Sequence, residues 1–216
     1  MMRNRNNRLV ILGFLWAILL GLMPAAKSAA ENLQAPQQVI QNVSMELQKK
    51  LKDKAFTQDF AQVTRFVNDV ISLHIDFDKI APLVLGKNWK TASAEEQQRF
   101  KQEFQTLIVR TYSRAFIEYN DWTLGFPPLE MSNEATKVIV KTQILQPARQ
   151  PVEVTYRMFL GNGEWKVYDI LIDGVSLVTN YRSTFSQEIK SKGSLSAVID
   201  GLVKRNAEAL SAKGSQ

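Results

Sequence analysis

The sequence predicts an α+β fold, in which an antiparallel sheet of about four strands is covered on one face by helices. Two changes in the spacing of apolar residues carry this prediction. Apolar residues recur at steps of three and four before the "GFPP" stretch at 125–128, and at steps of two beyond it. Steps of three and four indicate helices, whereas steps of two indicate strands. Helical spacing returns after residue 176, so helices precede and follow a single sheet.

Three helices are expected before residue 90. Pro36 stands where a first helix can begin, and a second helix is expected from about Thr57. The stretch "DFDKIAPLVLG" at 76–86 predicts a short helix that is broken at Pro82 and stopped at Gly86. The first of these helices carries Val39, Val43, Leu47 and Leu51 on one face.

The longest predicted helix begins at Ser93. "SAEE" has the spacing of a capping box, in which Ser93 accepts a hydrogen bond from the amide of Glu96 while the Glu96 side chain reaches back. An apolar stripe then extends over about seven turns to Tyr119. It contains Phe100, Phe104, Leu107, Ile108, Tyr112, Ala115 and Phe116.

The strands are predicted from alternating apolar residues at 138–144, 152–160 and 165–172, with "DWTLGF" at 121–126 as a possible fourth strand. "GNG" at 161–163 indicates a hairpin, because Asn-Gly readily adopts the positive φ angles of a tight turn. Two helices then end the chain, at about 178–189 and 195–203. Helices rich in Phe and Val that meet one sheet face can leave an apolar cavity. The alternative is that they fill this face completely, as in an adaptor without a ligand.

Residues 1–30 have the pattern of a secretory signal peptide that is cleaved near Ser28 to Ala30. A basic start, "MMRNRNNR", precedes about fifteen apolar residues and a stretch of small residues. A transmembrane anchor is the alternative, but a span needs about twenty apolar residues. Removal of this segment lowers the formal charge from +6 to +2, because it contains four basic residues and no acidic residue.

Composition excludes several functional classes. The processed chain has no basic block, which disfavours nucleic-acid binding. It has no cysteine, so an exported form would have no disulfide and must rely on its core. Its acidic residues are scattered and it has a single histidine, which disfavours a metal site.

Catalytic motifs are also absent from the sequence. His74 is interpreted as a capping or surface residue at the end of a helix. Asp169 and Asp173 are the two acids with apolar neighbours, and Asp169 could act as a general base in a small-molecule hydrolase or isomerase. The structural interpretation is favoured. Asp173-Gly174 then forms the turn from strand to helix, with Asp173 bonded to turn amides. Asp169 either lies on the solvated face of the sheet or accepts from a buried Tyr or Arg.

Two segments closely resemble the MlaC family, the toluene-tolerance-type periplasmic proteins of Gram-negative bacteria. The first is "LVLGKNWKTASAEEQQRFKQEFQTLIVRTYSRAF" at 83–116, and the second is "WKVYDILIDGVSLVTNYRSTFSQEI" at 165–189. The tail "KGSLSAVIDGLVKRN" at 192–206 is similar to the family's last helix. The resemblance spans about 37–206, and two signatures in the same order are more specific than one short motif.

The resemblance implies that residues 31–216 form one phospholipid-binding domain with a nuclear-transport-factor-like fold. It implies a monomeric periplasmic carrier that is not an enzyme, holds phospholipid as cargo and has no cofactor. Its partners would be an inner-membrane ABC complex with a ring-forming lipid-binding subunit and an outer-membrane lipoprotein–porin complex. The carrier would shuttle lipid between these two complexes.

The expected pocket lining follows from placing the apolar residues of the central helix, the strands and the last turn on one cavity. Tyr112 and Tyr181 are expected to gate its mouth, and Arg182 to pair with Asp169 or with a lipid phosphate. The expected lipid-binding residues are Phe104, Leu107, Ile108, Tyr112, Val140, Ile144, Val154, Tyr156, Met158, Val167, Ile170, Val175, Leu177 and Tyr181.

Overall fold

The structure, a computed structural model, describes residues 33–118 and 121–211. The described residues belong to one compact unit. The expected signal peptide at 1–30 and Tyr119, the last residue of the expected apolar stripe, lie outside the described residues.

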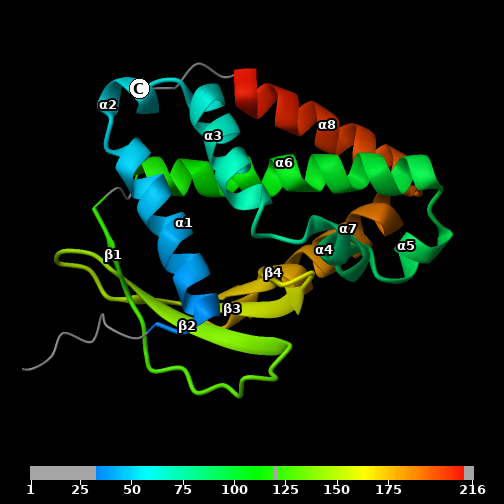
Figure 1. Cartoon of the computed structure of the whole chain (residues 1–216). Coiled ribbons are helices and arrows are strands. Elements are labelled where there is room, and N and C mark those ends of the chain that lie inside the picture. The colour runs from blue at the N-terminus through cyan, green and yellow to red at the C-terminus, as the bar shows by residue number, and fades with distance from the viewer. Residues whose placement is uncertain (1–32, 119–120, 212–216) are drawn as a thin grey trace, which may run out of the picture. The chain divides into compact units, whose positions relative to one another are not determined.

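Within the described residues, six helices precede the sheet and two follow it. The first six are α1 (Ala35–Leu51), α2 (Lys54–Thr57), α3 (Phe60–Ser72), α4 (Phe77–Leu85), α5 (Lys87–Thr91) and α6 (Ala94–Glu118). The last two are α7 (Leu177–Lys192) and α8 (Leu195–Ser211). In Figure 1, α1, α3 and α6 lie on the same side of the sheet, and α8 lies beside α6.

Five antiparallel strands form one sheet in the order of the chain. They are β1 (Thr123–Gly125), β2 (Lys137–Leu145), β3 (Val152–Gly161), β4 (Glu164–Ile172) and β5 (Val175–Ser176). Each strand pairs with the next, so the sheet is a meander (Figure 1). The predicted α+β fold is confirmed, and the sheet gains β5, which is too short to give an alternating pattern.

The predicted ends of three elements are confirmed. Ser93 and Glu96 form the capping box of α6: the Ser93 amide donates to Glu96 Oε2 at 2.9 Å, and the Glu96 amide donates to Ser93 Oγ at 3.2 Å. Asn162 and Gly163 take φ angles of 52° and 80° in the β3–β4 turn. Pro36 lies in the first turn of α1.

The predicted break at Pro82 is wrong. Pro82 lies inside α4, which continues to Leu85 and ends at Gly86, where φ is 56°. Proline removes one amide donor from a helix, but tertiary packing compensates here because Ala81 and Val84 on either side are almost fully buried. The second predicted helix also starts later than expected. Asp59 caps α3 through the amide of Gln62, and the short α2 ends at Thr57.

A β-bulge in β4 sets which side chains face the helices. Arg157 lies opposite Asp169 but Met158 lies opposite Val167, so one residue of β4 has no partner on β3. The extra residue shifts the alternation of side chains along the strand. Ile170 and Val167, three residues apart, therefore both face the helical layer.

The apolar core consists of three clusters. One, built around Phe100, Phe104 and Phe185, joins α4, α6, α7 and α8. A second joins α1, α2, α3 and α6. The third lies between α1 and the inner face of the sheet, and includes Ile40 and Met158. The rings of Phe100 and Phe104 lie 5.7 Å apart, and Phe185 meets the Phe100 ring edge-on at 5.1 Å, so this part of the core is filled.

Candidate functional site

A cavity of about 180 Å³ lies between the helices and the inner face of the sheet. Its helical wall is formed by α1, by the end of α3 and by α6. The residues of this wall are Ile40, Val43, Ser44, Leu47, Ile71, His74, Ile75, Ile108, Tyr112 and Phe116. Because α1 and α6 are amphipathic, each can turn an apolar face to the cavity and a polar face to water.

The other wall of the cavity is the sheet together with the residues that enter and leave it. Strands β1 to β4 all contribute, which follows from the alternation of side chains along each strand. The residues of this wall are Trp122, Leu124, Ile144, Val154, Tyr156, Val167, Ile170, Ile172 and Leu177. No Asp, Glu, Lys or Arg is among the described residues that line the cavity.

Tyrosines provide two of the few polar groups on these walls. Burial raises the pKa of Tyr156 to about 12. Burial, together with the nearby Tyr181, raises the pKa of Tyr112 to about 12. Both phenols therefore stay neutral over the physiological range, and the cavity walls carry no negative charge from them.

The structure brings eight of the expected lipid-binding residues together on the cavity. They are Ile108, Tyr112, Ile144, Val154, Tyr156, Val167, Ile170 and Leu177. The walls also contain residues that the sequence did not single out. Ile40, Val43 and Leu47 belong to α1, whose apolar stripe is visible in the sequence although nothing in the stripe tells which part of the core it meets.

Six expected residues lie elsewhere. Val140 and Met158 are fully buried in the third core cluster, and Leu107 packs on the first. Phe104 and Tyr181 pack edge-on at 5.3 Å, so Tyr181 belongs to the aromatic core and is not placed as a gate. Phe104 borders only a void of about 30 Å³. Val175 is 60% exposed because it lies in the edge strand β5.

His74 is a cavity residue that the sequence analysis placed at a helix end as a cap or surface group. It does follow α3, and its amide donates to the Ile71 carbonyl at 2.9 Å. Its side chain, however, lines the apolar cavity. One feature of the sequence indicates this position: Ile71, three residues before His74, and Ile75, one residue after it, are both apolar.

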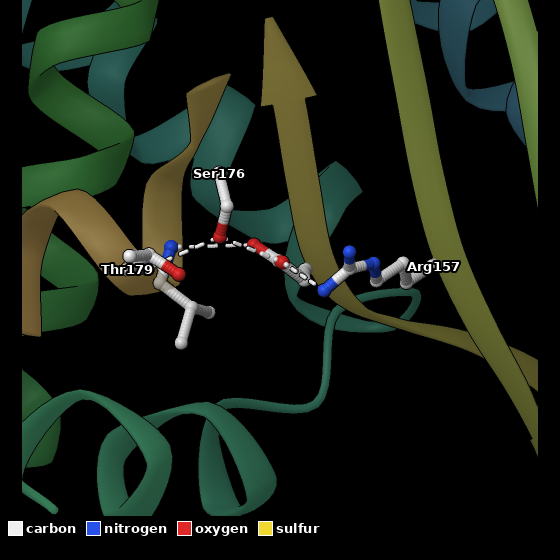
Figure 2. A network of polar contacts seen from close by, with 5 residues as sticks. Arg157, Ser176 and Thr179 are labelled. Carbon is white, nitrogen blue, oxygen red and sulfur yellow. Dashed lines mark hydrogen bonds and ion pairs between the residues drawn. The ribbon is translucent and has the colours of Figure 1, made fainter. Parts of the chain in front are cut away.

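Asp169 is held in a network of polar contacts at the start of α7 (Figure 2). Its Oδ2 accepts from Ser176 Oγ at 2.8 Å and from Arg157 Nη1 at 3.3 Å, and its Oδ1 accepts from the Val178 amide at 3.2 Å. Ser176 in turn caps α7 by accepting from the Thr179 amide at 3.1 Å. Both carboxylate oxygens are thus occupied by bonds that join β3, β4 and the first turn of α7.

The expected pairing of Arg182 with Asp169 is wrong. Arg182 Nε donates to the Leu83 carbonyl at 2.6 Å, which ties α7 to α4, while Arg157 reaches Asp169 from the neighbouring strand. Asp173 does form the predicted turn, with φ of 47°. Its carboxylate accepts from the amide of Glu153 on β3 at 3.2 Å, and not from the amides of its own turn.

A second and larger depression, of about 500 Å³, lies at the surface between α3 and α6. Its walls include Arg65, Asn68, Asp69 and Gln105, and Gln105 Nε2 donates to Asn68 Oδ1 at 2.7 Å. Polar groups that already bond to one another, facing open solvent, offer little to an apolar ligand. The smaller apolar cavity is therefore the candidate site.

Two features are absent from the described residues. Within 33–118 and 121–211, no group of three or more His, Cys, Asp or Glu could hold a metal ion. Over the same ranges, no helix combines the length and the apolar character needed to cross a membrane.

Comparison with known proteins gives consistent matches. Toluene tolerance protein ttg2D of Pseudomonas putida is 26% identical over 197 residues, which cover 89% of each chain. The intermembrane phospholipid transport system binding protein MlaC of Haemophilus influenzae is 27% identical over 114 residues, or 51% of this chain and 53% of that one. A solved structure of a phospholipid-binding protein from Ralstonia solanacearum, in complex with a phospholipid, matches with a TM-score of 0.74 and 25% identity.

The match to the Ralstonia structure covers 82% of this chain and 99% of that chain. The family model described as MlaC protein matches residues 41–204, which is most of the chain and includes both signature segments. The sequence resemblance is thus confirmed over residues 41–204, and the chain belongs to the MlaC family.

Proposed function

We propose that this chain is a phospholipid-binding transport protein that holds acyl chains in the cavity between α1, α6 and the sheet. The observation that carries the proposal is a cavity without Asp, Glu, Lys or Arg on its described walls, in a chain of the MlaC family. A relative named for phospholipid transport and a neighbour with bound phospholipid support it.

The apolar walls account for the energetics of such a carrier. A diacyl lipid has about thirty methylenes, each worth about 0.8 kcal/mol on removal from water, or roughly 24 kcal/mol in total. Transfer of free lipid through water is therefore prohibitively costly. If the cavity is about as apolar as a bilayer, a lipid has a similar free energy in the protein and in the membrane. One protein can therefore both load and release lipid.

The size of the cavity adds a requirement. Ligand pockets usually measure about 300–1,000 Å³, and this cavity measures about 180 Å³. The walls must move apart when a diacyl lipid enters.

The proposed location is the periplasm, and the proposed route is a shuttle between an inner-membrane ABC complex and an outer-membrane lipoprotein–porin complex. The export pattern at residues 1–30 supports the location. The name of the Haemophilus relative, an intermembrane phospholipid transport system binding protein, supports the route.

The contacts of Asp169 argue against the alternative hydrolase or isomerase. A general base needs a free lone pair directed at a substrate proton. Asp169 accepts three hydrogen bonds that hold the start of α7, and it does not line the 180 Å³ cavity. We therefore propose a binding function and assign Asp169 to the fold.

Organic extraction of the purified chain, followed by mass spectrometry, tests the proposal. Phospholipid should be recovered at a fixed ratio to protein, and the stripped protein should take up phospholipid from vesicles. A protein that is purified without lipid and takes up none from vesicles would contradict the proposed function.

A further inference from the structure

His74 differs from every other side chain on the cavity wall. The described lining contains no Lys or Arg, so His74 is the single lining residue that can carry a positive charge. It is also the only histidine of the chain. A group of this kind is costly on an apolar wall unless it meets a polar partner.

The backbone of His74 is held firmly against the sheet. Its carbonyl accepts from the Val167 amide at 2.8 Å, and the Asp76 amide donates to the Val167 carbonyl at 2.9 Å. The turn after α3 thereby forms a short bridge to β4 at Val167, which itself lines the cavity. The backbone that carries the imidazole is therefore held at the cavity wall.

This turn also lies at the boundary between the cavity and water. Leu73, immediately before His74, is 67% exposed, whereas Ile75, immediately after it, is half-buried and lines the cavity. His74 itself is half-buried. A ligand whose chains fill the cavity would therefore have its polar end near this turn.

The imidazole has no hydrogen-bond partner among the described residues, whereas the nearest acid in sequence is already engaged. Asp76 Oδ1 accepts from the Lys79 amide at 2.8 Å and so caps α4. The ring nitrogens of His74 are thus available to a ligand, and the Asp76 carboxylate is directed to the helix.

We infer that the His74 imidazole binds the phosphate of the cargo lipid where the cavity meets water. This inference depends on the proposed function and deepens it by naming the group that recognises the headgroup. A neutral imidazole has one N–H that can donate to a phosphate oxygen, and the protonated ring has two and adds a charge-assisted bond. Apolar walls alone hold any diacyl molecule, whereas His74 distinguishes lipids with a phosphate from lipids without one.

Binding measurements on a matched pair of ligands test this inference. Stripped wild-type protein and His74→Phe are titrated with phosphatidylglycerol and with diacylglycerol of the same chains, both supplied in micelles of a neutral detergent. His74→Phe should weaken binding of phosphatidylglycerol by about tenfold, the usual worth of one such hydrogen bond. Binding of diacylglycerol should be unchanged. Ser72→Ala, in the same turn but away from the cavity, should bind both as the wild type does.

The histidine count allows a direct measurement on the wild-type chain. With any affinity tag removed, the imidazole gives one set of carbon–proton signals in the NMR spectrum. Because His74 lines the cavity, either ligand can shift these signals, but phosphatidylglycerol should shift them clearly further than diacylglycerol of the same chains. This readout remains decisive if His74→Phe does not fold.

Two results would overturn the inference while leaving the proposed function intact. One is that His74→Phe weakens binding of both ligands equally, which would give His74 a structural role. The other is an imidazole signal that shifts equally with phosphatidylglycerol and with diacylglycerol. A wild-type protein that binds neither ligand would instead contradict the proposed function, and the inference with it.

Discussion

Asp169 illustrates how a buried acid in an apolar segment can belong to the fold. Its side chain is almost fully buried, yet each of its oxygens has a donor, and one of these donors is the Val178 amide at the start of α7. Helix starts leave amides without intrahelical partners, and a carboxylate there is favoured by hydrogen bonding and by the helix dipole. The signature segment "YDILIDGVSL" therefore contains, in Asp169, an acceptor that stabilises the start of α7.

We expect Asp169→Ala to lower the free energy of unfolding by about 2–4 kcal/mol, because it leaves buried donors without an acceptor. Arg157→Ala, the matched variant, should cost at most about 1 kcal/mol, since the Arg157 side chain is 44% exposed and exposed ion pairs contribute little. Urea denaturation of the two variants measures both values. Equal losses would show that the ion pair, and not the helix start, is what Asp169 stabilises.

Tyr156 gives a pH dependence of stability. Burial raises its pKa to about 12 in the folded chain, against about 10 in the unfolded chain. Between these values the unfolded chain loses the phenolic proton and the folded chain keeps it, so the stabilisation present below pH 10 is lost as the pH rises toward 12.

The free energy of unfolding should fall at alkaline pH, and the Tyr156 phenol should account for about 2 kcal/mol of that decrease. Tyr156→Phe should remove this contribution. The measurement is the difference in unfolding free energy between pH 9 and pH 11.5, in urea, for wild type and variant. Tyr112, with a similarly raised pKa, remains in both proteins and cancels in the comparison. A variant that loses as much stability as the wild type over this range would contradict a buried Tyr156 phenol.

At the level of elements, α6 was the most accurately predicted. Its capping box and its apolar stripe are both local properties of the sequence, and a helix of 25 residues has enough turns to make the period unambiguous. The β3–β4 turn was predictable for a similar reason, because Asn-Gly strongly favours one turn geometry. The continuation of α4 through Pro82 was not predictable, because it depends on what the helix packs against.

Ser93→Ala should lower the free energy of unfolding by about 1 kcal/mol through loss of the α6 cap. Glu96→Ala should act through the same pair, so the double variant should lose less than the sum of the two single losses. Thermal or urea unfolding of the wild type and the three variants completes this double-mutant cycle. Strict additivity would show that the two side chains do not act together.

The bulge in β4 places two expected lining residues, Val167 and Ile170, on the same face of the sheet. Strict alternation cannot place Val167 and Ile170 on one face, because they are an odd number of residues apart. The extra residue in β4 changes the phase between them. No short motif in the sequence predicts this bulge. Pairing with β3 therefore decides which side chains face the helices on either side of it.

At the level of the whole molecule, the cavity is the space that three core clusters leave between them. The rings of Phe100, Phe104 and Phe185 pack closely on one another, and a second cluster joins α1, α2, α3 and α6. The apolar residues of α1, α6 and the sheet that face one another across the middle do not fill the space completely. Two expected lining residues, Phe104 and Tyr181, are missing from the cavity because they fill the aromatic cluster.

One strand offers a matched pair of variants for the cavity. Ile144 on β2 lines it, whereas Ile139 on the same strand is 55% exposed on the opposite face of the sheet. Ile144→Trp should occupy part of the 180 Å³ and weaken phospholipid uptake from vesicles by about tenfold or more. Ile139→Trp should leave uptake unchanged. Circular dichroism checks that both variants fold, and equal uptake by both would place the lipid elsewhere.

The sequence by itself determined the order and type of the elements, the cap of α6, the hairpin turn and the family, because each is encoded in neighbouring residues or in long ordered signatures. Tertiary structure alone decided which apolar residues fill the core and which line the cavity. Leu107 and Ile108 look equally apolar in the sequence, yet only Ile108 reaches the cavity. The physical reason is that a cavity is defined by packing between α1, α6 and the sheet, segments that are distant in the chain and that no local spacing relates.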